Sequence, residues 1–397
     1  MRGLDRRGFL RVAGLGGLAM ASAGRAPFTP AWAAGPGAGW TEAAALEWAA
    51  AQPWLVGANY VPASAANALE MWQAGTFDPA RIDTELGWAA SLGMNTMRVF
   101  LHDLLWQDPD GFRGRVDTYL AIAARHGIRT LFVLFDSCWD PFPRPGPQRP
   151  PRPGVHNSAW VQGPGAAALA DPGQVPRLET YVTGIVGAFR EDPRVLGWDV
   201  WNEPDNTNDS SYGPSEPPDK VEHVLRLLPL AFDWARRAAP AQPLTSGVWV
   251  GDWSRDELLT PVRRIQLDRS DVVTFHNYGP AAEFEERIRQ LRRLGRPLIC
   301  TEYMARPTGS TFETILPIAR RERVGVMNWG FVAGRTQTYL PWDSWQRPYG
   351  TGDPPLWFHD VLRPDGRPYR EAEAEILRSL TGPGTGRDRP STSPARP

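Results

Sequence analysis

Apolar and polar positions follow one recurring unit along this chain. Apolar side chains at helical spacing over 78–92 predict an amphipathic helix, and Asp78 followed by a proline is a typical helix start. Gly93 ends this helix, and the apolar run NTMRVFL follows it as a short predicted strand. The same order of helix, glycine and strand returns with Gly127 and IRTLFVLF. Such alternation of strands with amphipathic helices is typical of a parallel sheet.

Eight apolar runs predict eight strands, at 55–60, 95–101, 128–135, 195–202, 243–249, 271–278, 296–303 and 324–331. Helical patterns lie between them, and a last one follows over 369–380. Nearly continuous apolar strands suit a sheet that is buried on both faces. The pattern therefore predicts a single-domain α/β fold, a (β/α)8 TIM barrel, over residues 54–380. A doubly wound open sheet is the alternative, but the sequence GANY after the first strand is not its Gly-rich phosphate turn.

Two long segments interrupt the regular alternation. Residues 137–176 follow the third strand and residues 333–358 follow the eighth, and both segments are rich in aromatic side chains. Loops of this length in a compact domain are usually functional or disordered, and the aromatic residues argue against disorder. Since the loops after barrel strands meet at the C-terminal face, we expect both segments there.

The two ends of the chain differ from the barrel region. Residues 1–33 resemble a twin-arginine-type signal peptide, with Arg6 and Arg7, a weakly apolar run, and a small-x-small cleavage site at 31–33. Residues 34–53 form a lead-in, and the Pro- and Gly-rich residues 381–397 are predicted to be a disordered tail. The signal predicts a periplasmic or secreted protein with no membrane attachment after cleavage.

Composition limits the classes of molecule that the protein is expected to bind. The formal net charge of −1 gives no basic field for nucleic acid, and 18 Trp among 397 residues indicate stacking surfaces as well as packing. Cys138 and Cys300 lack the spacing of zinc ligands. Cys138 follows the third predicted strand and Cys300 lies in the seventh, on the opposite side of the barrel, so we expect no disulfide and two small apolar side chains.

The candidate chemistry lies at the C-terminal strand ends, where a barrel builds its site. Glu203 ends the fourth strand and Glu302 ends the seventh, 99 residues later, which places the two carboxyl groups across one mouth. Such a pair can divide the work of glycoside hydrolysis, because one carboxyl group donates a proton while the other attacks the anomeric carbon. Strict alternation would point Asn202 and Glu203 to opposite faces, so we expect a bulge or the strand end to bring both to the site.

The motifs VWNEP, which contains Glu203, and TEY, which contains Glu302, resemble those of clan A glycoside hydrolases, particularly the cellulase-like family 5. The resemblance covers the whole barrel and implies that Glu203 is the general acid/base and Glu302 the nucleophile. It also implies that further strand-end residues bind substrate or support the nucleophile, namely Arg98, Asn202, His276, Tyr278 and Trp329.

One strand end departs from the family pattern. The family usually has a histidine at the end of the third strand, where this chain has Asp136 and Trp139. Asp136 either binds a sugar hydroxyl or caps the following loop, and Trp139 joins the predicted substrate-binding set. Asn59, near the end of the first strand, completes that set.

Together these features predict a retaining β-glycoside hydrolase that cleaves β-linked poly- or oligosaccharides, as cellulases, mannanases and xylanases do. Since carboxyl groups perform the chemistry, no metal or organic cofactor is expected. The alternatives are a transglycosylase with the same residues and a non-catalytic carbohydrate-binding barrel. The sequence leaves the glycan, and the choice between endo and exo action, open, and a monomer is the default expectation.

Overall fold

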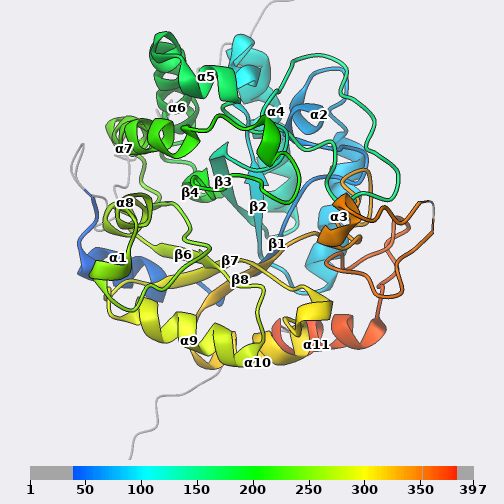
Figure 1. Ribbon diagram of the computed structural model, residues 1–397. Coiled ribbons are helices and arrows are strands. Elements are labelled where there is room, and N and C mark those ends of the chain that lie inside the picture. The colour runs from blue at the N-terminus through cyan, green and yellow to red at the C-terminus, as the bar shows by residue number, and fades with distance from the viewer. Residues whose placement is uncertain (1–38, 351, 382–397) are drawn as a thin grey trace, which may run out of the picture.

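The computed structural model describes residues 39–350 and 352–381. Their strands surround a centre and the helices lie outside them (Figure 1). The strands are β1 (Val56–Asn59), β2 (Thr96–Phe100), β3 (Arg129–Asp136), β4 (Val195–Asn202), β5 (Leu244–Thr245), β6 (Val273–His276), β7 (Leu298–Tyr303) and β8 (Gly325–Asn328). All eight predicted strands are confirmed, and every pairing between them is parallel.

Helices join consecutive strands, as the alternating pattern predicts, and one further helix precedes the first strand while another follows the last. They are α1 (Glu42–Ala50), α2 (Ala68–Trp72), α3 (Pro79–Ser91), α4 (Pro109–Arg125), α5 (Ala166–Ala170), α6 (Val175–Ala188), α7 (Lys220–Arg237), α8 (Pro261–Arg269), α9 (Ala281–Arg292), α10 (Phe312–Arg321) and α11 (Glu371–Thr381). The Asp78 side chain accepts a hydrogen bond from Arg81 N, so it caps α3 as its sequence position indicates.

The sheet order β5-β4-β3-β2-β1-β8-β7-β6 is that of a barrel whose two end strands must meet to close it. A single parallel bridge between Val248 and Phe275 makes this closure. Strand β5 has two residues where the apolar run 243–249 predicted seven. Side chains replace its ladder, because Ser246 Oγ donates to the carbonyl of Trp201 and Gln266 Nε2 donates to that of Gly247.

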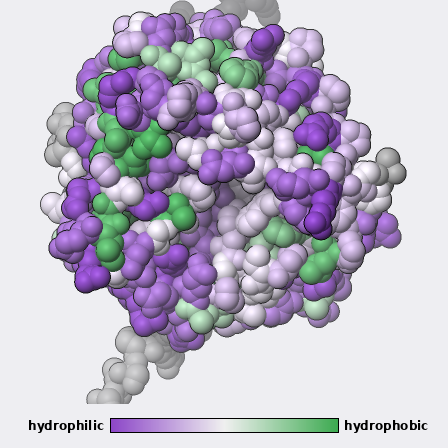
Figure 2. Space-filling model, viewed as in Figure 1, coloured by the Kyte–Doolittle hydropathy of each residue, from purple (hydrophilic) through white to green (hydrophobic). Residues whose placement is uncertain are grey.

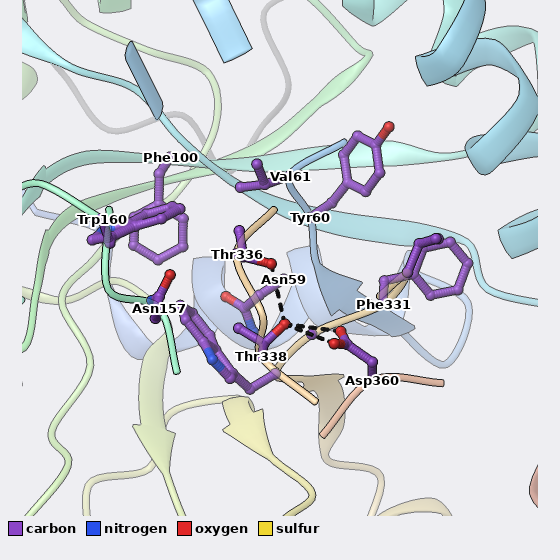
Figure 3. A pocket seen from close by; sticks show the side chains of 13 residues that line it. Asn59, Tyr60, Val61, Phe100, Asn157, Trp160, Phe331, Thr336, Thr338 and Asp360 are labelled. Carbon is purple, nitrogen blue, oxygen red and sulfur yellow. Dashed lines mark hydrogen bonds between the residues drawn. The ribbon is translucent and has the colours of Figure 1, made fainter. Parts of the chain in front are cut away.

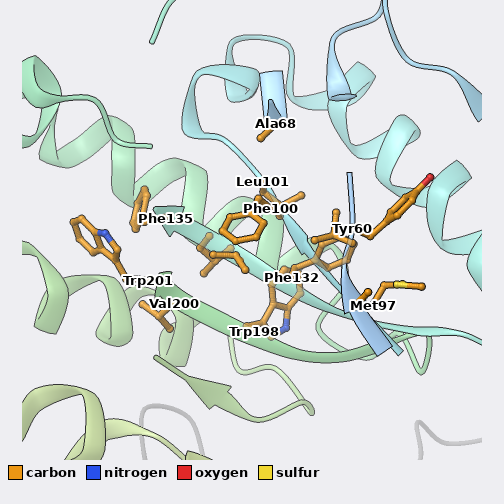
Figure 4. Packing of buried hydrophobic residues seen from close by; sticks show 14 of the residues in the cluster. Tyr60, Ala68, Met97, Phe100, Leu101, Phe132, Phe135, Trp198, Val200 and Trp201 are labelled. Carbon is orange, nitrogen blue, oxygen red and sulfur yellow. The ribbon is translucent and has the colours of Figure 1, made fainter. Parts of the chain in front are cut away.

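The main core lies between the strands and their covering helices. Figure 4 shows the aromatic part of it, where the rings of Phe132 and Trp198 have centroids 5.7 Å apart and those of Phe135 and Trp201 are 5.1 Å apart. A second cluster fills the N-terminal end of the barrel and includes Trp48 of α1. Helix α1 therefore closes the bottom of the barrel, a role that the sequence of the lead-in did not predict.

Two loops dominate the C-terminal face. The β3 loop (residues 137–165) and the β8 loop (residues 329–370) are the blue-green and orange segments that lie together in Figure 1. Figure 2 shows a mostly hydrophilic face with scattered hydrophobic groups and a hollow near its centre. Scattered hydrophobic residues of this kind are ordinary on a soluble surface.

Two predicted segments lie beyond the described residues. The export signal predicted over 1–33 falls outside them, and so does the predicted tail, apart from Thr381, which ends α11. Within residues 39–350 and 352–381, no helix combines the length and the apolar character needed to cross a membrane.

Candidate active site

The two predicted catalytic glutamates meet at the mouth of the barrel. Glu203 follows β4 with a left-handed backbone (φ 42°), and this turn at the strand end brings its side chain to the site beside Asn202. An extra residue in β7, Thr301, places Glu302 opposite His276 of β6. Carboxylate oxygens of Glu203 and Glu302 lie within 4.8 Å of each other, and both side chains are almost fully buried.

Donors hold the carboxylate of Glu302 on both sides. Arg98 Nη1 lies 2.7 Å from Glu302 Oε1, and the Tyr278 hydroxyl donates to Oε2 over 2.7 Å. Burial raises the pKa of Glu302, while the charge of Arg98 and the hydrogen bond from Tyr278 act against this effect by favouring the charged form. Burial and the nearby Glu302 charge raise the pKa of Tyr278, so that its phenol remains a proton donor.

Arg98 is the hub of a buried polar network. Its guanidinium pairs with Asp199 Oδ2 at 2.7 Å and donates to Asn59 Oδ1 at 2.8 Å and Asn202 Oδ1 at 2.7 Å. Burial disfavours the charged guanidinium, but Asp199 and Glu302 outweigh it and raise the pKa of Arg98. The network therefore fixes a permanent positive charge beneath Glu302.

Glu203 has a different environment. Its Oε1 lies 2.8 Å from His276 Nδ1, and its Oε2 accepts from Asn206 Nδ2 at 2.7 Å and from the Cys138 thiol at 3.3 Å. No arginine or lysine pairs with it among the described residues. Burial raises the pKa of Glu203 to about 7. The two carboxyl groups thus differ in the way that separates an acid from a nucleophile.

His276 lies between the two carboxyl groups. Its Nδ1 is 2.8 Å from Glu203 Oε1 and 3.5 Å from Glu302 Oε2. Burial lowers the pKa of His276 to about 4, so the ring is neutral near pH 7. A neutral ring leaves Arg98 as the fixed cation beside the pair.

Asp136 caps the loop that follows β3. Its Oδ1 accepts from Cys138 N at 3.0 Å and from Asn202 Nδ2 at 2.9 Å, and its Oδ2 accepts from Trp160 Nε1 at 2.6 Å. Of the two roles considered for Asp136, its contacts correspond to the loop cap. Through Asn202 it also orients the amide next to Glu203.

The two predicted tryptophans stand at the rim. Trp329 is partly exposed, and its ring meets those of Phe100 and Trp160 edge-on, with centroids 5.9 and 6.4 Å away. Trp139 is also partly exposed and stacks on Trp345 of the β8 loop at 5.4 Å. Both side chains are therefore only partly covered by their neighbours.

The structure joins most of the predicted site residues in one network. Hydrogen bonds or ion pairs connect Asn59, Arg98, Asp136, Asn202, Glu203, His276, Tyr278 and Glu302. Trp139 and Trp329 lie outside this network and border it with their rings. Asn59 contacts Arg98 and two backbone carbonyls, so in this structure it supports the guanidinium.

Sequence reasoning missed three polar partners. Asp199 pairs with Arg98, and its signal was present as the one charge inside the buried run VLGWDVWN. Asn206 contacts Glu203 by virtue of the turn after β4, which the pattern does not predict. Cys138 was predicted to be a simple apolar side chain, and this was wrong, because its thiol contacts the Glu203 carboxylate.

Among the residues that the structure describes, one group of side chains has the spacing of metal ligands. Glu203, His276 and Glu302 each offer one ligand atom, and these atoms lie within 4.8 Å of one another. Arg98 and Tyr278 already donate to Glu302 at 2.7 Å. The guanidinium thus supplies the positive charge that a cation would bring to this carboxylate.

Comparison with known proteins gives a family and a fold. The family model described as cellulase (glycosyl hydrolase family 5) matches residues 85–347. No curated protein sequence matches the chain.

Several solved structures share the fold. A GH5_18 variant from Streptomyces cattleya in complex with Manβ1-4GlcNAc is 17% identical with a TM-score of 0.55, covering 87% of this chain and 83% of that one. An exo-β-1,4-mannosidase from Opitutaceae bacterium strain TAV5 is 21% identical with a TM-score of 0.54, covering 83% and 60%. A β-mannanase from the blue mussel Mytilus edulis is 15% identical with a TM-score of 0.52, covering 74% and 90%. At such low sequence identities, the similarity to these structures shows a shared fold alone.

Proposed function

Since the chain belongs to glycosyl hydrolase family 5, a retaining clan A family, we propose that this β-glycoside hydrolase cleaves its substrate by double displacement with Glu203 and Glu302. The observation that carries the proposal is the distance between the two carboxyl groups, whose oxygens lie within 4.8 Å of each other. Retaining glycosidases have a short separation of about 5 Å, whereas inverting enzymes leave room for a water between the groups.

In the first step the Glu302 carboxylate attacks the anomeric carbon, and the bond from that carbon to the glycosidic oxygen breaks. Glu203 transfers its proton to the departing oxygen, so the leaving part of the glycan departs as an alcohol. A covalent ester between Glu302 and the retained sugar results. The burial of Glu203, which raises its pKa to about 7, keeps that proton available near neutral pH.

In the second step the ionised Glu203 removes a proton from a water molecule, and the water oxygen attacks the anomeric carbon. The ester bond breaks and returns Glu302 to its carboxylate form, so the two displacements together retain the β configuration. Arg98 and Tyr278 stabilise that carboxylate with their hydrogen bonds. The same residues could transfer the sugar to another glycan, and access of water to the ester decides between hydrolysis and transfer.

The remaining predicted residues position the sugar. Trp329 offers a flat apolar face to the ring of the retained sugar, and Asn202 lies beside Glu203, where its amide can bond the sugar 2-hydroxyl. Trp139 offers a second face at the rim. We place β-mannosides first among the candidate substrates, because neighbours of this fold include an exo-β-1,4-mannosidase, a β-mannanase and a protein in complex with Manβ1-4GlcNAc, and β-glucosides and β-xylosides follow.

Substitution of the two glutamates tests this mechanism. On aryl β-mannosides and β-glucosides, Glu302→Ala should lower kcat by at least about a thousandfold, because the attacking group is lost. Glu203→Ala should keep rapid first-step cleavage of substrates with a good leaving group and recover turnover when azide replaces water as the nucleophile. Glu313→Ala, on the exposed side of α10, is the control and should retain full activity.

The stereochemistry gives an independent measurement. Proton NMR of the first-formed product should show the β anomer. Full activity of either active-site variant, or an α product, would contradict the two-glutamate mechanism.

We also propose that the protein is exported and acts as a monomer. The paired arginines, apolar run and cleavage site at the start of the sequence support export. Replacing Arg6 and Arg7 together by lysine should leave the protein in the cytoplasm of a bacterial host, as measured by fractionation and activity. Export of this double variant at the parental level would contradict the twin-arginine assignment, and size-exclusion chromatography with light scattering tests the monomer.

A further inference from the structure

The β3 loop and the β8 loop are fastened to each other at the mouth of the barrel. Asn157 N donates to the carbonyl of Thr336 at 2.8 Å, and Tyr349 N donates to the carbonyl of Gly154 at 3.0 Å. Both pairs join backbone to backbone, so they do not depend on flexible side chains. The two loops therefore act as one continuous rim on this side of the site.

The β8 loop is tied in the same way to the segment that follows β1. Arg335 N donates to the carbonyl of Ala63 at 3.0 Å, and the Arg335 guanidinium pairs with Glu70 at 3.0 Å. A Cβ atom on Gly334 would lie 2.4 Å from the Cα of Ala63, so the two backbones are in close contact. No gap for a sugar chain is left where these segments meet.

Aromatic rings continue this barrier across the mouth. The short helix η6 (Trp342–Trp345) lies in the β8 loop. Trp342 meets the ring of Tyr278, which follows β6, at 5.1 Å, while Trp345 stacks on Trp139 of the β3 loop at 5.4 Å. Trp345 also meets Tyr212, in the loop after β4, at 5.1 Å. Helix η6 thus contacts loops from both sides of the barrel.

A pocket remains behind this barrier, next to Trp329. Asn59, Asn157, Thr336 and Thr338 line it, and Figure 3 shows their side chains around one common space. The Asn157 side chain is fully buried, yet neither its amide oxygen nor its amide nitrogen has a hydrogen-bond partner among the described residues. A buried amide without protein partners is costly, so we expect a water or a ligand hydroxyl to bond it.

The chemistry fixes which end of the glycan faces this pocket. Glu203 protonates the departing oxygen, so the departing part lies on the side of β4 and β5, where Trp249 is partly exposed and Val250 is 40% exposed. The retained sugar lies toward Glu302 and Trp329. The fastened loops close the space beyond that sugar, on its non-reducing side.

From this closure we infer that the enzyme is exo-acting and removes single sugar units from the non-reducing end of a β-linked glycan. The inference rests on the proposed hydrolase function and adds the form of its substrate. Asn157 is assigned the role of bonding hydroxyl groups on the far edge of the terminal sugar. An internal sugar carries another residue at that edge, and the joined loops leave it no room.

An end-blocked substrate tests the inference directly. The probes are β-1,4-linked pentasaccharides of mannose and of glucose, each free or carrying a 4,6-O-benzylidene group on the non-reducing terminal sugar, with ¹⁸O at the reducing end. Mass spectrometry should show the free compounds shortening by one unit at a time while the label stays on the longer product. The blocked compounds should react at least about a hundredfold more slowly.

The outcomes separate the two proposals. Cleavage of aryl β-glycosides together with internal cleavage of a blocked pentasaccharide would overturn the exo inference and leave the hydrolase function intact. No cleavage of any aryl β-glycoside or pentasaccharide would end both.

Variants of the barrier provide a second measurement. Trp345→Ala removes part of the wall and should raise the rate on a blocked pentasaccharide at least about tenfold. Trp357→Ala is the matched control, because Trp357 belongs to the same loop but stacks on Tyr369, with centroids 4.6 Å apart, and it should give no such gain. Equal rates for the two variants would argue against η6 as the barrier.

Asn157→Gly tests the pocket itself. Asn157 has a left-handed backbone (φ 49°), which glycine adopts without strain, so the change removes the side chain and its amide without straining the backbone. It should lower kcat/KM on the free pentasaccharide about fivefold to tenfold. An unchanged kcat/KM would remove Asn157 from the site.

Discussion

At the scale of single residues, the site depends on two carboxyl groups with different neighbours. Glu302 has a guanidinium and a phenol as donors, whereas Glu203 has a neutral imidazole, an amide and a thiol. The thiol of Cys138 is the weakest of these donors. It stabilises the ionised form of Glu203 less than a hydroxyl group would, and this helps to keep the proton on Glu203.

We therefore expect Cys138 to tune the pH dependence of the reaction. Burial raises the pKa of Glu203 to about 7, so kcat/KM should fall as the pH rises through this value and the acid loses its proton. Cys138→Ser supplies a stronger donor to the carboxylate and should move this basic limb to lower pH. Cys138→Ala removes the donor and should move the limb to higher pH. A pH profile of kcat/KM for the three proteins measures both shifts, and coincident limbs would show that the thiol only fills space.

Residues at strand ends could be predicted because the barrel places all of them at one mouth. Glu203, Glu302, Arg98 and His276 are of this kind, and one network contains them. The contact of Cys138 could not be predicted, because it depends on the left-handed turn at Glu203 and the path of the loop after β3.

At the scale of elements, close approach of backbones decides which substitutions the barrel tolerates. A Cβ atom on Gly57 of β1 would lie 1.8 Å from the carbonyl oxygen of Thr96 in β2. The two strands pair directly at this position, and both are buried. A side chain at residue 57 therefore forces the two strands apart.

Gly57→Ala should destabilise the fold by about 3 kcal/mol or more, because overpacking at a strand pair displaces backbone as well as side chains. Gly114→Ala is the control, since nothing lies within 4 Å of a Cβ at this exposed position of α4. It should stabilise the protein by about 0.5–1 kcal/mol through helix propensity. Urea unfolding of the two variants and the parent measures both effects, and equal midpoints for Gly57→Ala and the parent would contradict the steric argument.

The strands were predictable as apolar runs. The length of one strand and the presence of one helix were not. Strand β5 is shorter than its apolar run, because Ser246 and Gln266 take the backbone partners that a longer ladder would use. Helix α1 was missed because its alanine-rich sequence, EAAALEWAA, shows no clear apolar face. Its tryptophan is buried only because the open bottom of the barrel lies beside it.

At the scale of the whole molecule, the β3 loop and the β8 loop determine the shape of the site at the mouth of the barrel. The sequence predicted that both loops are ordered and share one face, since each follows a strand and is rich in aromatic residues. Their attachment to each other could not be predicted, because Asn157 and Thr336 meet although they are far apart in the chain. The inferred preference for a chain end over a chain interior rests on that attachment.

The closure of the barrel between β5 and β6 has a mechanical consequence. Every other neighbouring pair of strands shares a ladder, but this seam has one bridge, in which Val248 N donates to the carbonyl of Thr274 and His276 N donates to the carbonyl of Val248. Toward the bottom of the barrel, Asp271 N donates to the carbonyl of Leu244 and the hydroxyls of Thr245 and Thr274 share a hydrogen bond, so the top of the seam is the weaker part. We therefore expect local opening of the barrel to begin between β5 and β6. Since His276 is both the last residue fastened across the seam and the partner of Glu203, any local opening there also releases the acid from its neighbour. The closure of the barrel and the contact between His276 and Glu203 thus depend on the same few hydrogen bonds.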